Sequence, residues 1–165
     1  MALLALGAGC GGTRSTASTA RRVNQTHVEL QLILKAKERS PRLTVGQATC
    51  PPDVTARTGE SFECSVEIEG RPARYRVTIA EILGNQAQYE FRPLQAIIDL
   101  STVTDFLRSR LDERWRTAAI DCGQAKLRLA DIGATIECTV FDGASTRYIQ
   151  AVVEDRDGAV SLRER

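Results

Sequence analysis

The sequence predicts an α+β protein of two tandem units, each with one amphipathic helix packed on a four-stranded antiparallel sheet and with one intra-unit disulfide. A repeated phrase is the first reason. It reads GESFECSV at residues 59–66 and GATIECTV at residues 133–140. A cysteine precedes each copy, at Cys50 and Cys122, and a segment with helical periodicity precedes each of these cysteines. This repeat within 165 residues indicates two units of about seventy residues each.

The four cysteines of the repeat are predicted to form two disulfides, Cys50 with Cys64 and Cys122 with Cys138. A domain this small buries only ~60% of the surface that its unfolded chain exposes, so it usually needs a covalent cross-link. The two other uses of cysteine fit less well. Four-cysteine zinc sites use pairs separated by about two to four residues, and redox sites use C-x-x-C. We therefore expect structural disulfides in an oxidising compartment, and neither a metal site nor a cofactor.

A fifth cysteine, Cys10, ends a short apolar run with small residues just before it. Bacterial lipoprotein signals end in this way, with lipid attached to the cysteine. Residues 1–10 are therefore predicted to be a lipoprotein-type signal with Cys10 as the lipidation site. The alternative is a chance apolar start with a stray thiol, because no basic segment precedes the run and Gly7 stands where such signals normally have leucine. A true start upstream of Met1 would explain the missing basic segment.

Residues 11–21 are small, polar and without periodicity, so we expect a flexible tether. The net charge is +1 and it is balanced between the two halves, unlike the basic excess of a nucleic-acid-binding protein. No apolar run after the leader approaches the ~18 residues that a membrane-spanning helix needs. The single histidine, His27, falls near the start of a predicted helix and is expected to be a surface residue rather than a catalytic base. No phosphate-binding loop follows a strand, so we expect no enzyme.

The first unit is assigned to residues 22–97. Its helix is expected over residues 22–39, and its first strand over residues 44–50. From residue 61 apolar and polar residues alternate with the period of a strand, and the alternation resumes near residues 75 and 89. The outer face of the sheet is predicted to be solvated and salt-bridged. The residues behind these predictions are Val28, Leu30, Leu32, Ile33, Leu34 and Ala36 for the helix, Phe62, Cys64, Val66, Ile68, Tyr75, Val77, Ile79, Tyr89 and Phe91 for the inner face, and Glu63, Glu67, Glu69, Arg74 and Arg76 for the outer face.

The second unit is assigned to residues 98–165, and the short apolar segment 92–99 is expected to hold the units in contact. Its helix is expected over residues 102–116, with Thr102 and Asp105 as a capping pair. Aligning Gly143 with Gly70 places Tyr148 at the position of Tyr75. A strand is expected over residues 119–122, a turn over 156–158 and a closing strand over 159–162. The apolar stripe of the helix consists of Val103, Phe106, Leu107, Leu111 and Trp115.

These features together resemble a known family, the domain of unknown function numbered 4333, found in secreted proteins and lipoproteins of actinobacteria. The resemblance rests on a helix, a strand ending in Cys50-Pro51, the motif Gly59-x-x-Phe62-x-Cys64-x-Val66, a glycine turn and a Tyr-x-Val-Thr-Ile strand over residues 75–79. The second unit matches less closely, because Gly123 follows Cys122 and Ile136 replaces the phenylalanine. The resemblance implies an extracytoplasmic, disulfide-bonded α+β module and brings no reaction with it.

The function expected from the sequence is that of a non-enzymatic cell-envelope lipoprotein. It would lie on the extracytoplasmic face of the cell membrane, or alternatively be secreted, and would present a sheet face or the groove between its units to an envelope protein or a cell-wall component. A second hypothesis is an inhibitor of an extracytoplasmic enzyme, because tandem helix-plus-four-strand units with one disulfide each are similar to the β-lactamase inhibitory proteins. A third is a small-ligand carrier or an enzyme with a site between the units.

Overall fold

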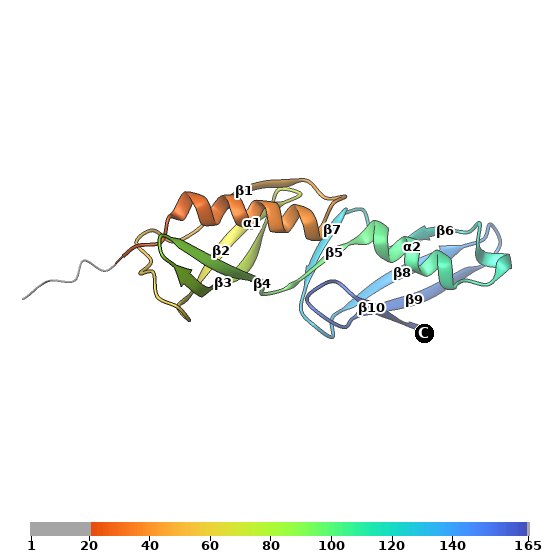
Figure 1. Cartoon of the computed structure of the whole chain (residues 1–165). Helices are drawn as coiled ribbons and strands as arrows, with labels where there is room; N and C mark the ends of the chain where they lie inside the picture. Colours follow the sequence, from red (N-terminus) through yellow and green to blue (C-terminus); the bar gives the residue numbers. More distant parts are fainter. Residues whose placement is uncertain (1–20, 165) are drawn as a thin grey trace, which may run out of the picture.

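Each half of the chain folds into a helix and a four-stranded antiparallel sheet, and the two halves lie end to end (Figure 1). The structure is a computed structural model that describes residues 21–164. The predicted signal, its lipidation site Cys10 and nearly all of the predicted tether lie outside the described residues. No helix within residues 21–164 is long and apolar enough to cross a membrane.

The first unit contains one helix and one sheet with strand order β1-β2-β3-β4. The helix begins at Gln25 because the side chain of Asn24 caps it by accepting a hydrogen bond from the backbone N–H of His27 at 3.1 Å. It therefore starts three residues later than residue 22, which instead bridges to Thr55. The elements are α1 (Gln25–Arg39), β1 (Val45–Thr49), β2 (Ser61–Ile68), β3 (Arg71–Leu83) and β4 (Gln86–Pro93).

One narrow stripe of α1 faces the sheet. Val28, Leu32 and Ala36 are completely buried, whereas Leu30 and Leu34 are 56% and 51% exposed. The prediction that Leu30 and Leu34 widen the buried stripe is therefore wrong. Residues two positions apart in a helix differ by about 200° around its axis, so side chains between the buried positions point to the opposite side.

The second unit repeats the plan with strand order β10-β9-β8-β6. Its helix ends at Arg110, earlier than expected, and a 3₁₀ turn then carries Trp115 into the core, where it is 3% exposed. The predicted capping pair Thr102 and Asp105 is wrong, because Asp99 caps the helix by accepting from the Ser101 backbone N–H at 2.9 Å. The elements are α2 (Leu100–Arg110), η1 (Glu113–Trp115), β6 (Ala119–Asp121), β8 (Thr135–Phe141), β9 (Thr146–Val153) and β10 (Val160–Glu164).

The register of β9 differs by one residue from the alignment of the two glycine turns. Cys64 lies opposite Tyr75 in the first sheet, and Cys138 lies opposite Ile149 in the second. Ile149 is therefore the counterpart of Tyr75, and the assignment of Tyr148 to that position is wrong. Because strand side chains alternate between faces, the slip moves Tyr148 to the outer face, where it is 62% exposed, while Ile149 is buried.

A two-stranded ribbon, β5 (Ala96–Asp99) paired with β7 (Leu127–Ala130), joins the two units. Ile97, Leu127 and Leu129 pack into the core of the first unit. The alternate residues Ala96, Ile98 and Ala130 pack into the core of the second. The ribbon was not predicted, and the predicted boundary between residues 97 and 98 falls inside β5.

The two disulfides link the same cysteines that the repeat predicts, Cys50 with Cys64 and Cys122 with Cys138. In each unit the bridge joins the end of the first strand to the middle of the strand beside it. All four cysteines are buried in the cores of their own units. Each bridge therefore fastens a sheet edge within one half of the chain.

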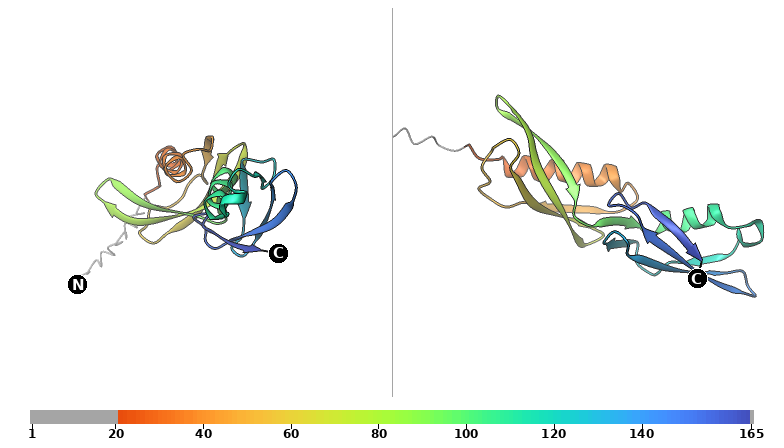
Figure 2. Two further views of the ribbon diagram at one scale, coloured as in Figure 1. Left: turned by 90° about the vertical axis from the view of Figure 1, so that its right-hand side faces the viewer. Right: turned by 90° about the horizontal axis from the view of Figure 1, so that it is seen from below.

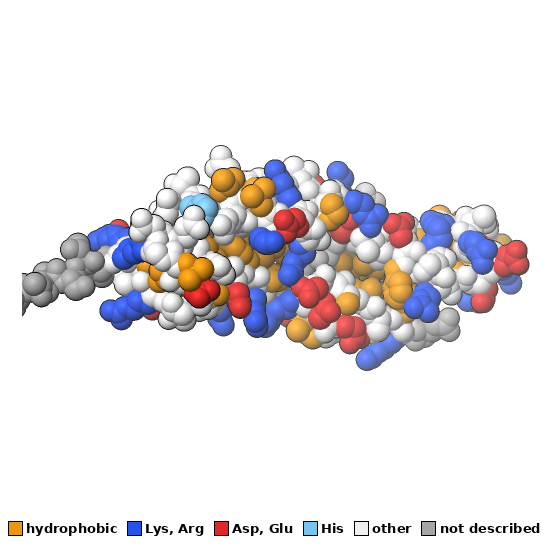
Figure 3. All heavy atoms as spheres, viewed as in Figure 1, with side chains coloured by type: hydrophobic (Ala, Val, Ile, Leu, Met, Phe, Trp, Pro, Cys, Tyr) orange, Lys and Arg blue, Asp and Glu red, His pale blue; other side chains and the backbone are white. Residues whose placement is uncertain are grey.

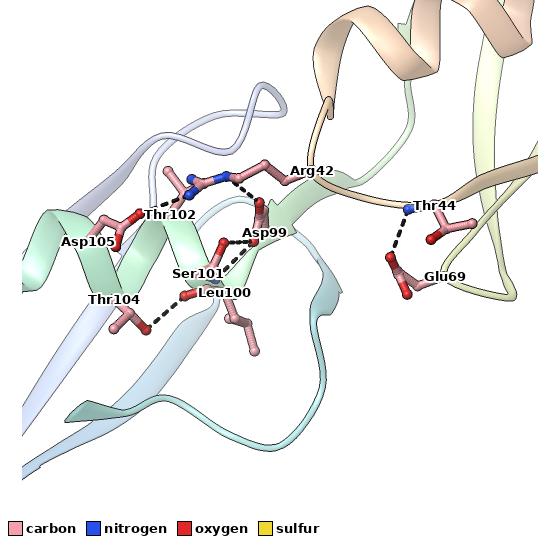
Figure 4. Close-up of polar contacts among 9 residues, drawn as sticks. All are labelled: Arg42, Thr44, Glu69, Asp99, Leu100, Ser101, Thr102, Thr104 and Asp105. Carbon is pink, nitrogen blue, oxygen red and sulfur yellow. Dashed lines mark hydrogen bonds and ion pairs between the residues drawn. The ribbon is translucent and has the colours of Figure 1, made fainter. Parts of the chain in front are cut away.

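Arg42, in the loop after α1, connects the first unit to the start of α2 (Figure 4). Its Nε lies 3.1 Å from Asp99 Oδ2, and its Nη1 lies 2.9 Å from Asp105 Oδ2. It also donates to the hydroxyl of Thr102. The hydrogen bond to Asp105, followed by the nearby charge of Asp99, raises the pKa of Arg42 above its ordinary value. The polar residues near the start of α2 thus serve the contact between units.

Removing either disulfide should destabilise the protein by roughly 3 kcal/mol. A cross-link that closes a loop of this size lowers the conformational entropy of the unfolded chain, and its loss stabilises the unfolded state by about that amount. The Cys50→Ala/Cys64→Ala and Cys122→Ala/Cys138→Ala variants would be compared with the unaltered chain by urea unfolding under non-reducing conditions. Unchanged midpoints in both variants would contradict a structural role for the bridges.

The ribbon makes a second prediction, because Leu127 belongs to the second half of the sequence but to the core of the first unit. Leu127→Ala should destabilise the first unit by about 2–5 kcal/mol. Hydrogen exchange should then speed up at the α1 amides near Leu32. The matched control is Leu107→Ala, in which the lost side chain is equally buried in the second core. If Leu127→Ala affects only amides of the second unit, the ribbon does not couple the cores as described.

Candidate ligand-binding groove

Helix α1 covers only part of the first sheet. It packs mainly against β1, while the β3–β4 hairpin reaches past it on the other side (Figure 2, left). In the register of these strands Val77 lies opposite Phe91 and Ile79 opposite Tyr89. Val77 and Ile79 are fully buried, but Tyr89 and Phe91 are only half-buried. The inner face of the sheet near β4 is therefore the floor of a groove between α1 and β4, here called the α1–β4 groove.

The part of the groove nearer the N-terminus of α1 is a hollow of about 770 Å³. Its walls are the first turns of α1 with the segment before it, and the tip of the β3–β4 hairpin. Arg21 holds the tip by donating to the backbone carbonyl of Gly84 and to Asn85 Oδ1, the latter at 3.2 Å. The lining residues are Arg21, Arg22, Val23, Asn24, His27, Gln31, Ala56, Ile82, Leu83, Asn85, Gln86, Ala87, Gln88 and Tyr89.

The groove continues from Tyr89 toward the second unit as a hollow of about 550 Å³, with a smaller one of about 420 Å³ beside it. Its end is formed by the turn between β9 and β10, so both units contribute to this part. Figure 3 shows this face of the molecule, with hydrophobic side chains between α1 and β4 and charged side chains gathered toward the boundary of the units. The lining residues are Lys35, Glu38, Arg39, Tyr75, Tyr89, Glu90, Phe91, Arg92, Pro93, Arg156 and Asp157.

Tyr75 lines the second-unit end of the groove from below. Its side chain is 1% exposed, and its hydroxyl has no hydrogen-bond partner among the described residues. Burial raises the pKa of Tyr75 to about 12, a shift that the charge of Arg39 opposes and that of Asp157 reinforces. A buried hydroxyl without a partner costs about 1–3 kcal/mol. This hydroxyl therefore lies beneath the lining of the groove with its hydrogen-bonding capacity unused by the described residues.

Ion pairs line the same end. Arg39 of α1 pairs with Asp157 of the second unit, Lys35 lies 2.8 Å from Glu38, and Arg92 lies 3.4 Å from Glu90. In the first half of the groove the imidazole Nε2 of His27 lies 2.8 Å from the side-chain nitrogen of Gln31. The lining residues of all three hollows include six Arg or Lys and three Asp or Glu side chains, a formal charge of +3, whereas the whole chain carries +1.

The groove presents several groups that can bind a ligand. His27 is exposed at the wall of the groove, as expected of a surface helix residue. Its ring is hydrogen-bonded to the side-chain amide of Gln31 rather than to a nucleophile. Within residues 21–164 no three His, Cys, Asp or Glu side chains are grouped in a way that could hold a metal ion. The arrangement offers an aromatic floor, amide and imidazole groups on one wall and paired charges at one end. Such groups favour non-covalent recognition.

The predicted site residues do not converge on the groove. The four disulfide cysteines lie in the cores, and Glu29 accepts a hydrogen bond from the Cys50 backbone N–H at 2.9 Å. On the predicted salt-bridged face, Glu63 lies 3.9 Å from both Arg74 and Arg76. Glu69 instead accepts from the backbone N–H of Thr44 at 2.7 Å, which lowers the pKa of Glu69 (Figure 4).

Sequence reasoning missed the groove, although one local signal pointed toward it. His27, Gln31 and Lys35 recur every four residues and form a polar row along α1 beside its buried stripe. In β4 the residues Ala87, Tyr89 and Phe91 alternate with polar ones, as on a half-covered sheet. Neither pattern shows how much of the sheet the helix leaves uncovered.

Comparison with known proteins identifies one family. Residues 5–84 match the model of a family described as a domain of unknown function (DUF4333). The match includes α1, β1, β2 and all of β3, so it covers the helix wall of the groove and ends before β4. No curated protein and no solved structure matches the chain. The expected resemblance is thus supported for the first unit, and the prediction of a second copy remains a prediction.

The raised pKa of Tyr75 gives a testable pH dependence. The unfolded chain loses the phenolic proton near pH 10, whereas the folded protein retains it up to about pH 12. The unfolded state therefore binds fewer protons in this window, and stability should fall as the pH rises through it, by up to about 2–3 kcal/mol from this group. Tyr75→Phe should remove this component of the fall measured by urea unfolding.

The matched control is Tyr148→Phe, which changes a largely exposed tyrosine in the second unit and should leave the alkaline slope unchanged. Burial also raises the pKa of Tyr89, so phenolate absorbance should show more than one tyrosine titrating late in the native protein, with the last step missing in Tyr75→Phe. Equal alkaline slopes for the unaltered chain and for Tyr75→Phe would show that this hydroxyl is not buried in solution.

Proposed function

We propose that this protein is a non-enzymatic binding module of the cell envelope, held by lipid on Cys10 at the extracytoplasmic face of the membrane. We further propose that the α1–β4 groove is its ligand-binding surface. The observation that carries the proposal is a half-buried aromatic floor, Tyr89 and Phe91, which ends above the buried hydroxyl of Tyr75, a group with no hydrogen-bond partner within residues 21–164. A buried polar group without a partner is rare in native proteins, and ligand sites combine apolar surface with a few polar groups.

The cysteines support the proposed location. Two disulfides inside small cores are typical of proteins that work in an oxidising compartment. The family match over residues 5–84 agrees with the resemblance on which the extracytoplasmic expectation also rested. The ligand would be an envelope protein or a cell-wall component.

The shape of the groove favours a partner that is long rather than compact. Its two parts meet at Tyr89 and together extend along β4 from Gln86 to Pro93. A second candidate function, a small-ligand carrier, is favoured by one observation. The hollow at the start of the groove measures about 770 Å³, within the range of sites for small molecules.

The proposal predicts that the groove contacts its ligand in living cells. A photoreactive amino acid at Gln31, on the groove wall, should give a reproducible crosslinked species after irradiation. The same amino acid at Thr117, an exposed residue of the second unit away from the groove lining, should not. The species would be measured on gels and identified by mass spectrometry.

The Cys10→Ser variant provides the test of the anchor. It should leave the membrane fraction and should lose the crosslinked species if the ligand resides at the membrane. Equal crosslinking from Gln31 and Thr117, or none from either, would remove the groove as the binding surface. Retention of Cys10→Ser in the membrane fraction would remove the lipid anchor.

A further inference from the structure

Strand β4 has a free backbone edge along the whole length of the groove. The first sheet ends at β4, which pairs with β3 on one side only. Its other side carries no strand among the described residues. Edge strands expose unpaired N–H and C=O groups that can pair with another chain, and proteins usually shorten or charge them. This edge is eight residues long, and its charged residues Glu90 and Arg92 alternate with the uncharged Ala87, Tyr89 and Phe91, which line the groove.

We propose that the α1–β4 groove accepts an extended protein segment of about eight residues, which adds to β4 as a fifth strand of the sheet. Its central inward side chains would be apolar and its ends acidic. This inference rests on the proposed function, because it names the ligand class of the same groove. At about 3.4 Å per residue the segment would span roughly 25 Å.

The pleat of the sheet decides which side chains the segment needs. In an added strand, alternate side chains point to the inner face and the others to the outer face. The inward ones would lie between α1 and the half-buried rings of Tyr89 and Phe91, whose centroids are 6.3 Å apart. Apolar side chains there would cover the floor, while the polar row His27, Gln31 and Lys35 would border them. Each apolar side chain buried this way contributes favourably in proportion to the area covered.

The charges decide the ends of the segment. Arg21 lies at the hairpin end of the groove and Arg156 at the second-unit end, and neither is ion-paired within residues 21–164. The buried hydroxyl of Tyr75 is a hydrogen-bond donor at the second-unit end. An acidic residue at each end of the segment would pair with the exposed guanidinium groups of Arg21 and Arg156.

The same observations argue against two other occupants. A second copy of this chain would bring two grooves of net positive charge edge to edge, which opposes pairing. An anionic polysaccharide would match the charge but would leave the backbone edge of β4 and the aromatic floor without partners. An acidic peptide in extended conformation satisfies all three features.

The test is selection of ligands from a displayed library of random ten-residue peptides, using the full disulfide-bonded chain as bait. The enriched sequences should alternate apolar and variable positions, with Asp or Glu near the ends. A synthetic peptide of the consensus sequence is then titrated by calorimetry. Tyr89→Ala and Phe91→Ala should each weaken its binding roughly tenfold. Arg156→Glu changes an exposed side chain outside both cores, so it tests the groove without disturbing the fold, and it should weaken binding by about fivefold.

Matched controls come from the second unit. Phe141→Ala and Tyr148→Ala remove exposed aromatic side chains outside the groove, and Arg163→Glu reverses an exposed charge there, so all three should bind like the unaltered chain. Backbone N-methylation of the peptide tests strand addition directly. Methyl groups on the alternate nitrogens that face β4 should abolish binding, and those on the other set should leave it within about twofold.

Several results would overturn the inference. One is that the enriched peptides bind the Tyr89, Phe91 and Arg156 variants as tightly as the unaltered chain. Another is that the peptide still binds with either pattern of N-methylation. The third is that the chain forms a concentration-dependent dimer that excludes the peptide. A failure to enrich any peptide, while Gln31 still crosslinks to a polysaccharide in cells, would overturn this ligand class and leave the groove as the binding surface. Peptide binding without any crosslink in cells would instead remove the proposed cellular function.

Discussion

The ribbon of β5 and β7 is the contact on which the arrangement of the molecule depends. A two-stranded ribbon of four residues per strand is not stable alone in water. It persists here because its alternating side chains are buried on both faces, with Ile97 and Leu127 in one core and Ile98 in the other. The β9–β10 turn packs closely against the ribbon as well. A Cβ added to Gly158 in this turn would lie only 2.9 Å from the carbonyl oxygen of Ile97. The two units therefore share a structural element rather than a linker.

This sharing has a consequence for the groove. Because the ribbon fixes the second unit against the first, the β9–β10 turn is brought to the end of α1, and Asp157 pairs there with Arg39. Arg42 adds polar contacts with Asp99 and Asp105 on the neighbouring side. The second-unit end of the groove thus depends on packing between units. A first unit by itself would have the aromatic floor but neither Arg156 nor Asp157.

The two units have the same plan but different chemistry at equivalent positions. Opposite the central cysteine, the first unit has Tyr75 and the second has Ile149, so only the first brings a hydroxyl to its inner face. In the second unit the edge strand β10 contributes Val160 and Leu162, which pack against the core. In the first, the edge strand β4 holds Tyr89 and Phe91 half-exposed beside α1. These differences are the reason why the proposed binding surface lies on the first unit, with the β9–β10 turn of the second unit closing one end.

Local pattern alone determined the two helices and most strands, because a period of two or 3.6 residues is visible within a short stretch of chain. The repeated phrase determined the pairing of the cysteines. Only the tertiary structure decided the ribbon, since β7 is four residues long and pairs with Ala96–Asp99, a strand far earlier in the sequence. It also decided that Leu30 and Leu34 face outward and that Ile149, not Tyr148, matches Tyr75. The tertiary structure also decided the groove. The position of α1 on the sheet sets how much of the sheet stays uncovered, and no single residue of the helix specifies that position. A sequence specifies which side chains can line such a surface, and long-range packing specifies whether the surface exists.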